Sequence, residues 1–161
     1  MKKILYYLLS LLLIGISLFS VTQIYDIIKQ NSNEKKQNEY LTNVAKKETQ
    51  ENSTDKEDVV EIDFESLQKV NDDIIAWIKI PDTTIDYAIV QGIDNDYYLH
   101  YNAMKEKNYA GAVFVDYNNI NPFKDVHTIV YAHNVKHGTM FAPLEKYMDE
   151  DFFQEHPIYY I

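Results

Sequence analysis

A histidine at the end of an apolar run is the residue of this chain best suited to proton-transfer chemistry. His133 follows the run Thr-Ile-Val-Tyr-Ala over residues 128–132 and directly precedes Asn134. A strand-end histidine can act as a catalytic acid or base, because imidazole titrates near neutral pH. The chain contains no cysteine, however, and all 15 of its basic residues are lysine. His133 therefore lacks a thiol nucleophile with which to complete covalent catalysis.

Two other histidines, His127 and His137, lie close enough to His133 in sequence to suggest a metal site. Together the three could supply imidazole ligands to zinc. Their spacing matches no established zinc motif, so we expect neither a metal nor another cofactor. Asp116, at the end of a second apolar run, could orient a histidine, although an aspartate in this position more often caps a turn.

Short apolar runs separated by turn residues predict a mainly β domain over residues 62–161. The predicted strands cover residues 74–80, 85–91, 110–116, 126–131 and 156–161. Short helices are expected over residues 63–70 and 141–153, where apolar residues recur at helical spacing. This pattern points to an antiparallel or mixed barrel or sandwich. Because the last predicted strand runs to the final residue, we expect the barrel to be incomplete at its carboxyl terminus.

The amino-terminal segment is apolar enough to cross a membrane. Residues 4–24 form a stretch of about the length that a spanning helix needs, and Lys2 and Lys3 precede it. The two lysines favour a cytoplasmic amino terminus. A cleaved signal peptide is the alternative, but no clear A-x-A-like cleavage site follows the apolar stretch. We therefore assign residues 1–28 to a cytoplasmic tip and an uncleaved transmembrane anchor, with the domain outside the cell membrane.

Residues 29–61 are predicted to be a polar stalk between the anchor and the domain. They are rich in lysine, asparagine, glutamine, glutamate, serine and threonine, with almost no aromatic residues, and such a composition buries little apolar surface. A solvated helix is the alternative, because residues 34–47 contain good helix formers and neither proline nor glycine. Either structure would space the domain from the membrane.

The charge and the cysteine content exclude some functions. The formal net charge is −10 and the isoelectric point is near 4.8, which argues against binding to nucleic acid, whose phosphates require a basic surface. Without cysteine, an extracytoplasmic domain has no disulfides to stabilise it.

The order and spacing of several short motifs resemble the landmarks of sortases, most closely those of class B. The motifs occupy residues 77–87, 90–92, 95–99, 111–116 and 131–134. Sortases are membrane-anchored cysteine transpeptidases of Gram-positive bacteria that fold as a β-barrel. They cut a sorting signal near the carboxyl terminus of a surface protein and transfer the acyl group to a cell-wall amine. The resemblance implies that residues 62–161 are the amino-terminal portion of a sortase-like domain.

The resemblance also implies roles for individual residues. His133 matches the catalytic histidine, which would act as general acid for the leaving amine and as base for the incoming amine. Asn95, Leu99 and Tyr131 match positions that line the sorting-signal groove. The expected partners are surface proteins that carry a carboxyl-terminal sorting signal, and a peptidoglycan or pilin amine as acceptor.

The sequence departs from the family pattern in lacking both the nucleophilic cysteine and the arginine that stabilises the oxyanion. In the family both residues follow the position at which this chain stops, so we expect a truncation before them and an inactive chain as written. Other interpretations are a membrane-tethered, peptide-binding module without catalysis, a pseudogene product, and an unrelated β domain that supports an envelope complex.

Overall fold

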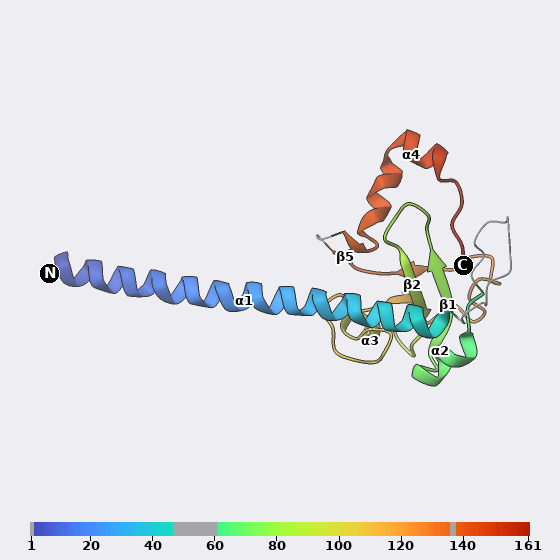
Figure 1. Ribbon diagram of the computed structural model, residues 1–161, viewed down its shortest axis with the longest axis horizontal. Helices are drawn as coiled ribbons and strands as arrows, with labels where there is room; N and C mark the ends of the chain where they lie inside the picture. Colours follow the sequence, from blue (N-terminus) through green and yellow to red (C-terminus); the bar gives the residue numbers. More distant parts are fainter. Residues whose placement is uncertain (1, 47–60, 136–137) are drawn as a thin grey trace. The chain divides into compact units, whose positions relative to one another are not determined.

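The computed structural model describes residues 2–46, 61–135 and 138–161 (Figure 1). The chain divides into two compact units, residues 1–36 and residues 37–161. The helix α1 (Lys2–Ala45) forms the first unit and continues into the second.

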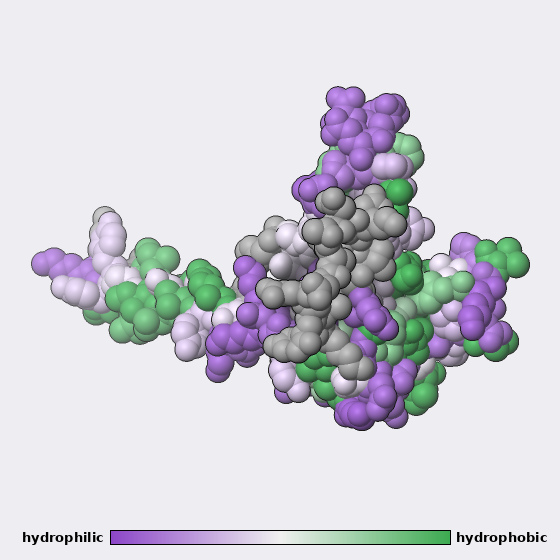
Figure 2. Space-filling model, turned by 45° about the vertical axis from the view of Figure 1, so that its right-hand side comes forward, coloured by the Kyte–Doolittle hydropathy of each residue, from purple (hydrophilic) through white to green (hydrophobic). Residues whose placement is uncertain are grey.

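Within the first unit, α1 carries an apolar stretch over Tyr6–Asp26 with a mean hydropathy of 1.9. By length and composition this stretch could cross a membrane, although a signal sequence would pass the same test. Figure 2 shows the apolar surface of this helix in green at the left of the view. The hydroxyl groups of Ser10, Ser20 and Thr22 donate hydrogen bonds of 2.7 to 2.9 Å to backbone carbonyls of the preceding turn. These polar groups therefore need no water as a partner, which suits an apolar environment.

The second unit contains a mixed sheet in the order β1-β2-β3-β4. The strands are β1 (Ile74–Lys79), β2 (Asp86–Val90), β3 (Val113–Val115) and β4 (Val130–Tyr131). The β1–β2 and β3–β4 pairs are antiparallel and the β2–β3 pair is parallel. A separate hairpin, which the sequence did not predict, pairs β5 (Asn134–Val135) with β6 (Thr139–Met140). In the described residues both sheets are open, so the predicted mainly β fold is present without a closed barrel.

Both faces of the four-stranded sheet are buried. Alternate residues of β2 and β3 point to opposite faces, as the two-residue period of a strand requires. One cluster contains Ala88, Val90 and Phe114, and the other contains Ile89 and Val113. Burial on both faces explains why these strands read as continuous apolar runs rather than as an alternation of apolar and polar residues.

The end of α1 belongs to the first of these clusters. Leu41 and Ala45 are buried there, and the carbonyl of Ala45 accepts a hydrogen bond of 2.8 Å from the backbone nitrogen of Asp63. The segment 29–61, predicted as a polar stalk or a solvated helix, is helical up to Ala45, but Leu41 and Ala45 are core residues, so this part of the helix is not fully solvated. Residues 47–60 of that segment lie outside the described part of the chain.

Short helices surround the sheet. They are α2 (Phe64–Val70), α3 (Tyr97–His100), the 3-10 helix η1 (Ala142–Met148) and α4 (Glu150–Glu155). Asp63 caps α2 by accepting a hydrogen bond of 3.1 Å from the backbone nitrogen of Ser66. The single helix predicted over residues 141–153 is wrong. Asp149 interrupts it, because its extended backbone ends η1 while its side chain caps α4 by accepting from the nitrogen of Phe152 at 3.0 Å.

The strands predicted over residues 110–116 and 126–131 are much shorter in the structure, where they form only β3 and β4, and the strand predicted over residues 156–161 is reduced to a single bridge. Before β4, the side chain of Asn119 takes the place of a neighbouring strand: it donates to the carbonyl of His127 at 2.7 Å and accepts from the nitrogen of Ile129 at 3.2 Å. This explains why the strand predicted over residues 126–131 begins only at Val130. The segment 156–161 forms only an isolated bridge, between Tyr160 and Lys79.

Candidate functional site

Three segments that are distant in sequence meet at the carboxylate of Asp116, directly after β3. Asn95 Nδ2, from the loop before α3, donates a hydrogen bond of 2.9 Å to Asp116 Oδ2. Tyr131 Oη, at the end of β4, donates a hydrogen bond of 3.0 Å to the same oxygen. The structure thus brings together two of the four residues that the sequence predicts for the site.

A turn after Asp116 occupies the other carboxylate oxygen. Asn118 donates to Asp116 Oδ1 from its backbone nitrogen at 2.8 Å and from its side-chain Nδ2 at 2.9 Å. These hydrogen bonds from Asn118, together with those from Asn95 and Tyr131, lower the pKa of Asp116 to about 2. The interpretation of Asp116 as a turn cap is confirmed. In the described residues no histidine hydrogen-bonds to Asp116, so its alternative role of orienting one is not observed.

The amide of Asn95 is held at both ends. While Nδ2 donates to Asp116, Oδ1 accepts a hydrogen bond of 3.0 Å from the backbone nitrogen of Tyr117. This pair of contacts defines the orientation of the amide, because a half-turn would place the NH₂ group against the Tyr117 N–H. The position of Asn95 is therefore set by two segments of the protein at once.

The phenol of Tyr131 reaches from the core to the surface. Its ring lies 5.3 Å from the ring of Phe114, which is fully buried, while 37% of Tyr131 remains exposed. The hydrogen bond to the Asp116 carboxylate, followed by partial burial, raises the pKa of Tyr131. The hydroxyl is thus a fixed neutral group that a ligand can approach.

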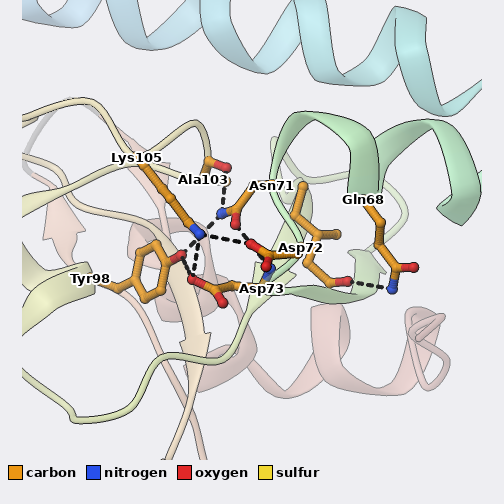
Figure 3. A network of polar contacts seen from close by, with 8 residues as sticks. Gln68, Asn71, Asp72, Asp73, Tyr98, Ala103 and Lys105 are labelled. Carbon is orange, nitrogen blue, oxygen red and sulfur yellow. Dashed lines mark hydrogen bonds and ion pairs between the residues drawn. The ribbon is translucent and has the colours of Figure 1, made fainter.

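Leu99 lies on α3 and packs, partly buried, against the first core cluster. Figure 3 shows how the neighbouring Tyr98 is anchored: Asn71 Nδ2 donates to Tyr98 Oη at 3.0 Å, and Tyr98 Oη donates to Asp73 Oδ2 at 2.5 Å. Lys105 Nζ lies 3.2 Å from the same oxygen of Asp73. Burial, and then the hydrogen bond to Asp73, raises the pKa of the Tyr98 phenol. These contacts fix α3, and with it Leu99, against the segment that follows α2.

Gly111 allows a close approach to α3. Its φ of 62° lies in the left-handed region, and a Cβ atom at this position would lie only 2.4 Å from the carbonyl oxygen of Tyr98. The next residue, Ala112, donates its backbone N–H to that carbonyl at 2.9 Å. A glycine is therefore required where the chain enters β3 beside α3.

His133 follows β4 and is half-buried. Its Nε2 is buried and has no hydrogen-bond partner among the described residues. The imidazole lies 6.2 Å from the ring of Tyr109, and the backbone carbonyl of His133 accepts from the nitrogen of Phe141 at 3.1 Å. A buried ring nitrogen without a partner is uncommon in folded proteins, so this atom is a position where a further group could bind. Within the described part of the chain, no hydrogen bond joins His133 or Leu99 to Asp116.

The described residues contain no group of three or more histidine, aspartate or glutamate side chains placed to hold a metal ion. The zinc alternative needed His127, His133 and His137, and His137 lies outside the described residues.

The role of Asp116 as the link between Asn95 and Tyr131 was missed by the sequence interpretation. The pattern Asp-x-Asn at residues 116–118 is typical of a turn in which the aspartate accepts from the backbone two residues later, and it could have indicated the turn. It carries no information about partners 21 and 15 residues away.

Comparison with known proteins finds relatives of this chain, although no protein-family model matches it. The chain is 42% identical over 153 residues to sortase B of Listeria monocytogenes, a match that covers 94% of this chain and 61% of that protein. The chain is homologous to sortase B. Among solved structures, sortase B of Bacillus anthracis in complex with AAEK1 superimposes with a TM-score of 0.67 at 36% identity, over 83% of this chain and 62% of that chain. A substrate complex of Staphylococcus aureus sortase B gives a TM-score of 0.55 at 39% identity, over 60% and 44% of the two chains.

The match to sortase B covers nearly all of this chain, but this chain spans only 61% of the length of the Listeria protein. The Listeria protein therefore extends beyond the part that this chain matches.

Proposed function

We propose that this chain provides the signal-binding and proton-transfer part of a class B sortase-like transpeptidase. Such an enzyme cleaves a carboxyl-terminal sorting signal and attaches surface proteins to the cell wall. The observation that carries the proposal is the 42% identity to sortase B over 94% of the chain. The substrates would be surface proteins with a sorting signal, and the acceptor an amine of peptidoglycan or of a pilin.

In this proposal His133 acts as general acid and base. Its Nε2 makes no hydrogen bond to the described residues, so no group among them competes for the proton that it would exchange with the leaving amine and then with the incoming amine. The chain contains no cysteine, so by itself it cannot form the acyl-enzyme on which a sortase depends. We therefore expect the 161-residue chain alone to be inactive.

Asn95, Leu99 and Tyr131 would contact the sorting signal. Asn95 and Tyr131 support this role through their fixed, partly exposed polar groups beside Asp116. Leu99 supports it through its place on the anchored helix α3.

The same proposal places the domain outside the membrane. The apolar stretch Tyr6–Asp26 and the two preceding lysines support a single-pass anchor with an extracytoplasmic domain. Protease added to intact protoplasts should then degrade residues 37–161 while a cytoplasmic control protein survives. Protection of the domain, or its release without the apolar stretch, would contradict this topology.

A peptide-binding module without catalysis is the second candidate. The observation that favours it is the absence of both cysteine and arginine from the sequence. Such a module would keep the binding residues and have no use for His133 as an acid or base.

One experiment separates the two candidates. This chain is joined to the part of Listeria sortase B that it does not match, and cleavage of a fluorogenic peptide carrying that enzyme's sorting signal is measured. We expect turnover by the chimera and none by the chain alone. His133→Ala should reduce turnover by about 10² to 10⁴-fold, the usual contribution of general acid–base catalysis, whereas the matched control His127→Ala should retain it.

Cleavage by the chain alone that persists through purification would contradict the thiol mechanism. A folded chimera that binds the peptide without cleaving it, and that His133→Ala does not alter, would favour the binding module.

A further inference from the structure

The carboxylate of Asp116 is saturated with donors. Oδ1 accepts two hydrogen bonds from Asn118, and Oδ2 accepts one each from Asn95 and Tyr131. A carboxylate has about four acceptor sites, so none is left for a ligand. Asp116 therefore does not bind a ligand directly; it can act only through the groups that it holds.

Tyr131 is left with a defined hydrogen-bonding polarity. Its single O–H proton points to Asp116 Oδ2, and in the described residues Tyr131 Oη has no other hydrogen bond. What the hydroxyl offers to solvent is an oxygen lone pair, which is an acceptor. A phenol without the carboxylate could offer either a donor or an acceptor.

Asn95 is left with the complementary polarity. One N–H of its amide points to Asp116, its oxygen accepts from the Tyr117 N–H, and the second N–H has no partner in the described residues. Because both ends of the amide are held, the plane of the amide and the direction of this N–H are fixed. Asn95 therefore presents a donor beside the acceptor of Tyr131.

We propose that Asp116 is a positioning residue: it orients Asn95 and Tyr131 so that both hydrogen-bond to the backbone of one residue of an extended peptide. The N–H of that residue donates to Tyr131 Oη, and its carbonyl accepts from Asn95 Nδ2. In an extended strand the N–H and C=O groups of one residue point to the same side, as in a ladder pair. Asn95 Nδ2 and Tyr131 Oη are both within 3.0 Å of one oxygen, so they are close enough together to serve one residue.

This inference rests on the proposed function, because it takes the sorting-signal peptide as the ligand. The added point is that Asn95 and Tyr131 bind the main chain of the peptide rather than one of its side chains. The low pKa of Asp116, about 2, keeps the carboxylate ionised, so the polarity of the pair does not change across the neutral pH range.

The first test uses the full chain in detergent micelles and a fluorescein-labelled peptide that carries the sorting signal of Listeria sortase B, with affinity measured by anisotropy. Asp116→Asn replaces one of the two acceptor oxygens with an NH₂ group, so two of the four donors around residue 116 lose their acceptor, and we expect peptide binding to weaken by about tenfold or more. Asp125→Asn is the matched control. It removes the same charge from an aspartate of the loop after β3 that contacts neither Asn95 nor Tyr131, and it should bind as the wild type does.

A swap that preserves the net charge tests whether Asp116 sets the donor and acceptor directions of Asn95 and Tyr131 or only stabilises the fold. In D116N/N95D, the new amide can donate to the new carboxylate, whose other oxygen still accepts from the Tyr117 N–H. We expect the melting temperature to recover. Peptide affinity should stay low, because position 95 now presents only acceptors and the Tyr131 hydroxyl is no longer held as a donor to a carboxylate.

A third arm changes the ligand instead of Asp116. Each amide of the peptide is replaced in turn by an ester, which removes one N–H. One ester should weaken binding to the wild type while having little further effect on Tyr131→Phe, because that variant already lacks the acceptor oxygen. This arm remains informative even where Asp116→Asn does not fold.

The outcomes distinguish failure of the proposed function from failure of the role proposed for Asp116. If the wild type does not bind the peptide, the proposed function fails and the inference fails with it. If the wild type binds and Asp116→Asn binds equally well, or the swap restores affinity together with stability, or no ester position couples to Tyr131, then the inference is overturned while the proposed function stands.

Discussion

Leu41 is the residue that decides whether the end of α1 belongs to the folded domain. It is 4% exposed and lies in the same cluster as Leu67 and Trp77. Replacing a buried leucine with alanine typically costs about 2 to 5 kcal/mol, because apolar contacts are lost and a cavity remains. A typical domain has a total free energy of unfolding of about 5 to 15 kcal/mol. Leu41→Ala should therefore remove a large fraction of the stability of the second unit.

The measurement is urea unfolding of the full chain in detergent micelles. Trp77 is the only tryptophan of the sequence and is buried in the same cluster as Leu41, so its fluorescence reports on this core. With a mid-range slope of about 2 kcal/mol per molar urea, the midpoint of Leu41→Ala should fall by about 1 to 2.5 M. Asn43→Ala, an exposed position on the same helix, is the matched control and should change the free energy of unfolding by less than about 0.5 kcal/mol.

Equal midpoints for Leu41→Ala and the wild type would refute this reasoning. Residues 29–61 would then behave as the solvated stalk that their composition predicts, and the domain would begin at Ile62 or later.

Two further predictions concern the site. Gly111→Ala should lower the melting temperature and also weaken peptide binding, because a Cβ atom 2.4 Å from the carbonyl oxygen of Tyr98 must displace α3; unchanged melting and binding would show that α3 tolerates the shift. The pKa of Asp116, lowered from 3.8 to about 2, means that its carboxylate stabilises the folded chain above about pH 4 and that this stabilisation is lost as the pH falls toward 2. The difference in unfolding midpoint between the wild type and Asp116→Asn should therefore be constant from pH 8 to pH 5 and shrink below pH 4; a change between pH 7 and pH 5 would contradict the assignment.

The strands that the sequence predicts well are those whose partners are also apolar strands. The predicted ranges 74–80 and 85–91 match β1 and β2 closely, because both strands are buried on two faces and their runs are long. The prediction over 126–131 was too long because the side chain of Asn119 supplies the hydrogen bonds there. Residues 141–153 have the apolar spacing of one helix, yet the side chain of Asp149 caps α4 and so divides the segment into two helices. Local side-chain hydrogen bonds of this kind compete with regular structure and leave little trace in an apolar pattern.

The sequence predicts less of the candidate site than of the fold. His133, Asn95, Leu99 and Tyr131 were named through the family resemblance, and the geometry that joins two of them depends on a third residue. Asp116 looked like an ordinary turn cap, which it is, while its second oxygen has partners in two other segments. Such a dual role arises only when the fold brings the segments together.

The fold explains why Asp116 can hold this position. Its backbone N–H donates to the carbonyl of Ile129 at 3.0 Å, which extends the β3–β4 pairing by one residue. From the other side, Gln91, directly after β2, donates its side-chain amide to the carbonyls of Asp116 and Asn119 at 3.1 and 2.8 Å. The backbone of Asp116 is thus held by both neighbours of a strand whose two faces are buried. Because the core and not the ligand orders these groups, a peptide that binds beside Asp116 loses little free energy to ordering the site.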